Sequence, residues 1–133
     1  MQFNITTDYA IRSVVYLASH PGVCNCPDIS ESMVIPISYL RKILHKLKEA
    51  GLVRNFLGSN GGFALAKPAE EITLLEIIRI MEDTVFINRC LEYDHYCSRE
   101  AVAACPINRV YCKLQAQLEE TLNVSVAALL QAE

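Results

Sequence analysis

The sequence predicts a mainly α-helical protein with one small β-hairpin, and three observations on its 133 residues lead to this class. Apolar side chains recur at helical spacing in several segments, and hydrophobic residues make up 52% of the chain, which is enough to build a core. Two short runs typical of strands flank a glycine-rich stretch at residues 58–62, as in a β-hairpin. A long amphipathic segment begins at Pro106, a residue type that favours the first turn of a helix.

Three helices are expected in close succession in the first part of the chain. The first begins near Thr6 or Thr7, whose side chains can cap it, and runs to about residue 19. A short helix is expected over residues 28–33 and a longer one over residues 37–50. A short helix, a tight turn and a longer helix form the helix-turn-helix plan, whose second helix lies in the major groove of DNA.

The third of these helices has one apolar face and one polar face. Its apolar arc consists of Ile37, Leu40, Ile43, Leu44 and Leu47. The side expected to face the major groove consists of Ser38, Tyr39, Arg41, Lys42 and His45. One face of this helix can therefore pack on a core while the other reads double-stranded DNA.

The expected hairpin directly follows this helix, which is the position of the wing in a winged helix-turn-helix. Its strands are predicted over residues 52–57 and 63–66. Glycines at the tip allow the backbone to approach phosphates closely. The expected phosphate contacts come from Arg54, Ser59, Asn60 and Gly61.

The charge distribution supports an anionic partner. The whole chain has a net charge of −3, but residues 36–67 carry six basic side chains and one acid, a net charge of +5. The rest of the chain therefore carries −8. A basic island on an acidic body is a typical footprint of a protein that binds a DNA operator.

The second part of the chain is expected to carry the dimer contacts. Thr73 and Glu76 form a capping box that opens a helix to about residue 82, and the last long helix runs from Pro106 to about Leu122. Its apolar stripe, suited to a homodimer, is Ile107, Val110, Tyr111, Leu114, Leu118 and Leu122. The predicted division is a winged helix-turn-helix domain at 1–83, a cysteine-rich loop at 84–105, and a long C-terminal dimerisation helix with a tail at 106–133.

Composition also restricts the compartment and the chemistry. No stretch is long and apolar enough to span a membrane, and charged residues interrupt any N-terminal signal sequence, so we expect a cytoplasmic protein. Disulfides are rare there, so the six cysteines indicate metal binding or redox sensing, although Cys24 and Cys26 are interpreted as structural or incidental. The sequence lacks a Cys-x-x-Cys motif and a phosphate-binding glycine loop, which argues against an enzyme.

The other four cysteines have the spacing of a cluster site. Intervals of six, seven and six residues separate successive members of the series Cys90, Cys97, Cys105 and Cys112. Zinc sites use pairs about two to four residues apart, whereas wide spacing on an irregular loop suits an iron–sulfur cluster. Cys112 lies about 10 Å along the helix axis from Cys105. The favoured ligands are therefore the first three cysteines, with Cys112 and His95 as alternatives.

Five ordered motifs cover nearly the whole chain, at residues 7–12, 35–40 with 47–53, 58–63, 72–78, and at Cys105-Pro106 with the helix that follows. This ordered set resembles the Rrf2 family of bacterial transcription regulators. The resemblance implies a dimeric winged-helix protein that binds DNA and is not an enzyme. Leu57 departs from the pattern, because the wing of this family often has an arginine there, so Arg54 is expected to contact phosphate instead.

The resemblance extends to the cofactor, and the match is to the NsrR-like and IscR-like members. In NsrR-like members an aspartate at the start of the first helix, supplied by the other subunit, completes the cluster, and Asp8 matches that aspartate. The resemblance implies a [4Fe-4S] cluster, favoured over [2Fe-2S], held by Cys90, Cys97, Cys105 and Asp8, through which the protein senses nitric oxide, redox state or iron–sulfur status. The alternative is a metal-free, thiol-responsive regulator resembling CymR.

Overall fold

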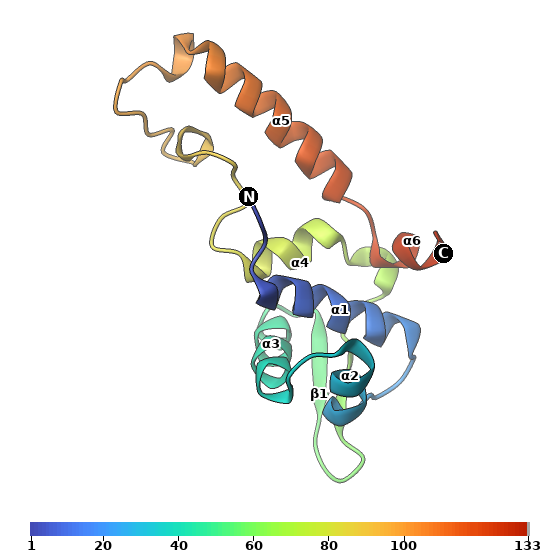
Figure 1. The fold of residues 1–133 in the computed structure, drawn as a ribbon. Coiled ribbons are helices and arrows are strands. Elements are labelled where there is room, and N and C mark those ends of the chain that lie inside the picture. Colours follow the sequence, from blue (N-terminus) through green and yellow to red (C-terminus); the bar gives the residue numbers. More distant parts are fainter. Residues whose placement is uncertain (133) are drawn as a thin grey trace.

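The computed structural model describes residues 1–132 and shows a helical body from which one long arm projects (Figure 1). The elements in chain order are α1 (Ile5–Ser19), α2 (Cys26–Met33), α3 (Ile37–Glu49), β1 (Val53–Phe56), β2 (Gly62–Leu65), α4 (Leu74–Met81), α5 (Pro106–Leu122) and α6 (Val126–Gln131). Single 3₁₀ turns lie at Ala69–Glu71, Arg89–Leu91 and Val102–Ala104. The arm consists of α5 and the loop before it, and the other elements form the body. The predicted class, mainly α with a two-stranded wing, is confirmed.

Helix α1 forms the centre of the body and contacts α2, α3, α4 and α6. Its buried side chains join those of α3 and α4 in one hydrophobic core, which includes Ala10, Val14, Leu17, Leu40, Ile43, Leu44, Leu47 and Ile77. Ile37, which the apolar arc included, is 36% exposed because it lies in the first turn of α3, at the edge of this core. The arc therefore begins at Leu40, and the rest of the prediction is confirmed.

The N-terminal end of α1 differs from the prediction. The helix begins at Ile5, before Thr6 and Thr7, so neither threonine caps it. Thr7 is fully buried, and its hydroxyl donates to Glu82 Oε1 at 2.8 Å. The same carboxylate accepts from the backbone N–H of Asn4 at 2.7 Å and from its side-chain amide at 2.9 Å. A carboxylate that follows α4 thus binds the N-terminal end of α1, where negative charge is stabilising.

Helices α2 and α3 form the predicted helix-turn-helix. Helix α2 begins at Cys26, two residues earlier than predicted, because the Asn25 side chain caps it by accepting from the Asp28 N–H at 2.9 Å. Helix α2 ends at Met33, and the residue that follows, Val34, has a left-handed φ of 54° and turns the chain toward Pro36. Helix α3 then ends at Glu49, one residue before the predicted end.

The hairpin pairs β1 with β2 in antiparallel register, with Phe56 opposite Gly62. A second antiparallel pair joins Cys24 to Phe63, with N–H···O distances of 2.8 Å in both directions. The second strand of the wing is therefore attached, near its turn end, to the segment that precedes α2.

Helix α4 has the predicted N-terminal cap but only half of the predicted capping box. Thr73 Oγ1 accepts from the Glu76 N–H at 3.1 Å. The Glu76 carboxylate instead accepts from Lys67 Nζ at 2.9 Å, which places it in an ion pair with the segment after the wing.

Helix α5 begins and ends as predicted, and the tail after it contains a further helix, α6, that the sequence analysis did not predict. Helix α6 packs on α1, with Val126 fully buried in the core. The residues before it pair with the start of α4: the Leu74 N–H donates to Val124 O at 2.9 Å, and the Val126 N–H donates to Ile72 O at 2.8 Å. The end of the chain thus belongs to the body. None of the helices within residues 1–132 is long and apolar enough to cross a membrane.

Candidate functional site

The polar side of α3 forms an exposed basic surface next to the wing. The five residues expected to face DNA, which are Ser38, Tyr39, Arg41, Lys42 and His45, are all exposed, opposite the buried leucine and isoleucine side chains of the same helix. His45 Nε2 lies 3.0 Å from Glu49 Oε1 on the next turn. Tyr39 contacts Tyr9 of α1 edge-on, with ring centroids 6.2 Å apart. This surface has the shape and charge of a recognition helix.

The wing carries the four residues expected to contact phosphate, and three of them are exposed. Arg54, Ser59 and Asn60 are exposed, and the Arg54 guanidinium lies 5.7 Å from the centre of the Phe56 ring. Gly61 is half-buried, and a Cβ there would lie 2.2 Å from Phe56 O. The hairpin therefore requires glycine at this position for its own turn, a reason that the sequence alone did not reveal.

Cys24 and Cys26 lie between the wing and the recognition helix. Cys24 carries the backbone pairing to the wing, and Cys26 lies beside Arg41 of α3. Burial raises the pKa of the Cys24 thiol, and the nearby Asp28 carboxylate adds to that rise. Burial also raises the pKa of the Cys26 thiol, although the Arg41 guanidinium opposes it. Both groups therefore favour the neutral thiol, as packing cysteines do.

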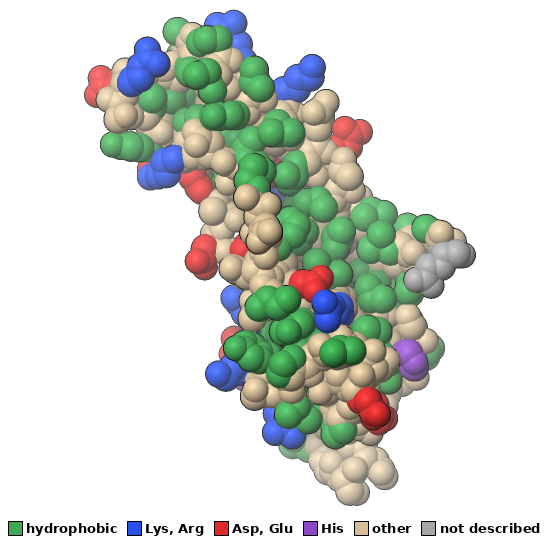
Figure 2. Space-filling model, viewed as in Figure 1, with side chains coloured by type: hydrophobic (Ala, Val, Ile, Leu, Met, Phe, Trp, Pro, Cys, Tyr) green, Lys and Arg blue, Asp and Glu red, His purple; other side chains and the backbone are tan. Residues whose placement is uncertain are grey.

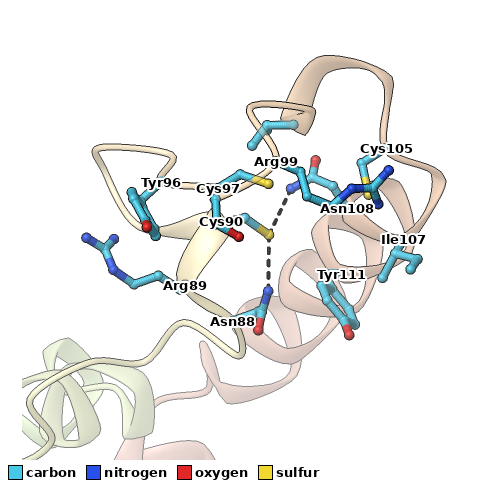
Figure 3. A pocket seen from close by; sticks show the side chains of 12 residues that line it. Asn88, Arg89, Cys90, Tyr96, Cys97, Arg99, Cys105, Ile107, Asn108 and Tyr111 are labelled. Atoms are coloured by element: carbon cyan, nitrogen blue, oxygen red, sulfur yellow. Dashed lines mark hydrogen bonds between the residues drawn. The ribbon is translucent and has the colours of Figure 1, made fainter.

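Three of the four cysteines in the second half of the chain line one pocket in the arm (Figure 3). This pocket has a volume of about 350 Å³ and lies between the cysteine loop and the first turns of α5. Cys90 comes from a 3₁₀ turn, Cys97 from the loop, and Cys105 from the residue that precedes α5. The other lining residues are Asn88, Arg89, Tyr96, Ser98, Arg99, Val102, Ile107, Asn108 and Tyr111.

Hydrogen-bond donors surround two of these sulfur atoms. The backbone amides of Ala101 and Arg99 lower the pKa of the Cys97 thiol. Cys90 Sγ accepts from Asn88 Nδ2 at 3.3 Å and from Asn108 Nδ2 at 3.2 Å. Donors directed at sulfur stabilise the thiolate, which is the form that binds metals.

The other candidate ligands lie outside this pocket. Cys112 and His95 line a neighbouring pocket, to which Cys90 also contributes. Asp8 lies on α1 in the body and pairs with Arg12 at 2.7 Å. Within residues 1–132, no three His, Cys, Asp or Glu side chains lie close enough together to hold a metal ion as they stand. Three thiols of one chain therefore line one pocket, whereas Asp8 of the same chain lies outside this pocket, on α1.

Residues that the sequence analysis did not select hold this loop in place. Gln115, buried in α5, accepts from the Ile87 N–H at 3.0 Å and donates to Val85 O at 3.1 Å. The side-chain amide of Gln115 thus bonds to both a backbone N–H and a backbone C=O at the start of the cysteine loop. The amides of Asn88 and Asn108 were also missed, although Asn108 follows Cys105 by three residues and so lies on the same face of a helix.

The outer face of the arm is apolar. In the stripe predicted for dimerisation, Ile107 is 54% exposed, Val110 is 63% exposed and Leu114 is 43% exposed. Hydrophobic side chains gather over this part of the arm in the space-filling view (Figure 2). Large apolar side chains are thus exposed along one face of α5.

The exposed recognition helix, the wing and the helical arm define a winged-helix DNA-binding protein. The chain matches the Rrf2 family, described as iron-dependent transcriptional regulators, over residues 3–132, and it belongs to this family. Rrf2 proteins are DNA-binding transcription regulators and not enzymes, as the sequence predicted.

Relatives and solved structures agree with this assignment. The chain is 31% identical over 121 residues to a protein of Aquifex aeolicus described as an HTH-type transcriptional regulator, covering 90% of this chain and 84% of that one. It is 33% identical over 124 residues to protein aau3 of Rhizobium meliloti, covering 92% and 75%.

Two solved structures share the fold. The global cysteine regulator CymR of B. subtilis superposes with a TM-score of 0.84 at 20% identity, over 100% of this chain and 98% of that one. IscR of T. potens superposes with a TM-score of 0.77 at 24% identity, over 100% and 89%.

Proposed function

We propose that this regulator binds DNA as a homodimer and senses its signal through an iron–sulfur cluster, with Cys90, Cys97 and Cys105 as ligands from one chain and Asp8 of the partner subunit as the fourth. We favour [4Fe-4S] over [2Fe-2S]. The observation that carries the proposal is the single pocket lined by these three thiols. When bound, such a cluster supplies a site that nitric oxide, oxygen or loss of iron can change.

The chemistry of the pocket fits this cofactor. Thiolates are soft ligands that favour iron–sulfur sites, and the amides beside Cys97 and Cys90 stabilise that form. All six cysteines of the chain, which lie within residues 1–132, are free thiols. A three-cysteine pocket leaves one ligand position for a group from outside the chain, and a carboxylate there would be the most labile of the four ligands.

The position of Asp8 supports its role as the link to DNA binding. Arg12, which pairs with Asp8 at 2.7 Å, also donates to Met33 O at the end of α2, at 3.1 Å. The next residue after Asp8 is Tyr9, whose ring contacts Tyr39 on the recognition helix. If Asp8 leaves Arg12 for another partner, the contacts on both sides of the turn between α2 and α3 change. Such a local exchange can shift the protein between two states.

We further propose that the exposed polar side of α3 reads the major groove and that the wing, through Arg54, contacts phosphate. The net charge of +5 over residues 36–67 supports this, since phosphate neutralisation drives binding. The apolar outer face of α5 supports dimerisation, which would place two recognition helices on half-sites about one helical turn apart. Nitric oxide is the first signal to test, because Asp8 matches the NsrR-like members.

The test is anaerobic reconstitution followed by counting iron and acid-labile sulfide. The parent is expected to hold about four of each per chain. Cys97→Ala is expected to lose the cluster, whereas Cys112→Ser, a change at a cysteine of the neighbouring pocket that keeps a donor to Asn108, is expected to keep it. Full cluster in Cys97→Ala would refute the ligand set. If only Asp8→Ala proves silent, the three thiolates stand and His95 or Cys112 becomes the fourth-ligand candidate.

DNA binding separates a sensor from a protein that merely holds metal. Holo and apo forms are expected to differ in affinity for the same operator at fixed salt, and equal affinity would refute sensing through the cluster. A parent protein that takes up no iron would instead favour a thiol-responsive regulator like CymR.

A further inference from the structure

The geometry points to Asn88 and Asn108 as positioning residues that hold Cys90 as a cluster ligand and set how firmly the cluster is kept. This inference rests on the proposed function and adds residues to the site. Its basis is one sulfur atom, Cys90 Sγ, that receives two side-chain amides from different elements. Asn88 lies just before the 3₁₀ turn that carries Cys90, and Asn108 lies in the first turns of α5 (Figure 3).

The orientation of the Asn108 amide is determined by a further contact. Cys112 Sγ donates to Asn108 Oδ1 at 3.5 Å, so the oxygen of this amide faces Cys112 and its nitrogen faces Cys90 at 3.2 Å. An asparagine amide has two N–H donors and one carbonyl acceptor, so this arrangement uses both ends of the group. Cys112 therefore acts on the pocket from outside it, through Asn108, although it does not line the pocket.

These contacts matter chemically because a coordinating sulfur carries negative charge. Hydrogen bonds to the sulfur ligands of a cluster help to set its reduction potential, and groups that support a ligand typically change metal affinity by about 10- to 100-fold when removed. Cys97 and Cys105 are not contacted by the two asparagine amides, so the effect is specific to one of the three ligands. Removing the amides is expected to loosen Cys90 first and to make the reduction potential more negative.

The experiment compares cluster retention among variants after anaerobic reconstitution. Asn108→Asp keeps the shape of the side chain but directs carboxylate oxygens at the sulfur, and Asn88→Leu removes the donor at an exposed position. Both variants are expected to bind the cluster about 10- to 100-fold more weakly than the parent, measured as transfer of iron to a competing chelator. Asn123→Asp, the same chemical change at the opposite end of α5, is expected to behave as the parent does. Far-UV circular dichroism of the apo forms establishes that each variant is folded.

A second pair of variants tests the contact from Cys112. Cys112→Ser keeps a donor to Asn108 and is expected to retain the cluster as the parent does, whereas Cys112→Val removes the donor and is expected to weaken retention. A more negative midpoint reduction potential of the cluster in Asn108→Asp, measured by redox titration, is the readout that a purely structural role would not produce. The inference is overturned if Asn108→Asp and Asn88→Leu both retain the cluster at the potential and affinity of the parent. A parent that binds no cluster refutes the proposed function itself, which is a separate result.

Discussion

Replacing Gly62 with alanine perturbs the attachment of the wing to the body. A Cβ at this position would lie 2.1 Å from Cys24 O and 2.6 Å from Cys24 C. Real Cβ atoms do not approach backbone atoms so closely, and neither neighbour is the flexible end of a side chain. The chain must therefore separate here, which breaks the two 2.8 Å hydrogen bonds between Cys24 and Phe63.

The size of the effect follows from these contacts. Overpacking of a well-packed site costs about 1–3 kcal/mol, and each lost backbone hydrogen bond costs about 1 kcal/mol. Part of the overpacking is relieved when the hydrogen bonds break, so the two contributions overlap. We expect Gly62→Ala to lower the free energy of unfolding by about 3 kcal/mol, which for a chain of this size lowers Tm by about 10 °C.

The assay is thermal unfolding of the apo protein, with Gly58→Ala as the matched control. Gly58 also has a positive φ, of +99°, but a Cβ there would meet no heavy atom of residues 1–132 within 4 Å. The control change introduces only backbone strain, about 1–2 kcal/mol. Gly62→Ala should also reduce DNA affinity, because the wing is displaced. Equal Tm values for the two variants would refute the argument that the close approach to Cys24 holds the wing.

Three further changes test the rest of the structure. Glu82→Ala should cost about 2 kcal/mol in urea unfolding, because the buried Thr7 hydroxyl loses its charged acceptor; a smaller loss in Glu82→Gln, which keeps an acceptor, is the expected comparison. Leu114→Glu should give a folded monomer in sedimentation, and a variant that remains dimeric would exclude the α5 stripe as the interface. Arg41→Ala combined with Lys42→Ala should weaken operator binding and reduce its salt dependence without lowering Tm; normal binding would contradict the assignment of α3 as the reading helix.

Local sequence patterns were sufficient for the elements whose stability is decided within a few residues. Helical periodicity placed Leu40, Leu44 and Leu47 in the core, because residues three or four apart share a face wherever the helix packs. Pro106 marked the start of α5 for a similarly local reason, since its fixed φ suits a first helical turn. The glycine-rich turn and its flanking strands likewise predicted the wing.

The ends of α1 and the fate of the C-terminal tail depended on contacts between distant parts of the chain. Glu82, which binds the start of α1 through Asn4, follows Asn4 by 78 residues in the sequence. No local pattern around Thr6 and Thr7 could therefore reveal this contact. Helix α6 was missed because its place in the core depends on backbone hydrogen bonds to residues near the start of α4, which are distant in the sequence. A short apolar segment has no packing partner in its own neighbourhood, and so its periodicity is uninformative.

The candidate site shows the same division. Sequence spacing alone identified the cysteine loop and the preference for Cys90, Cys97 and Cys105 over Cys112, because the rise of a helix separates residues seven positions apart. Only the tertiary structure decided that these three thiols line one pocket, that amides from a turn and from α5 meet at Cys90, and that Asp8 stays with Arg12 in the body. The physical reason is that spacing limits how far apart two residues can lie, whereas the folding of the loop back onto α5, held by Gln115, determines which of them meet.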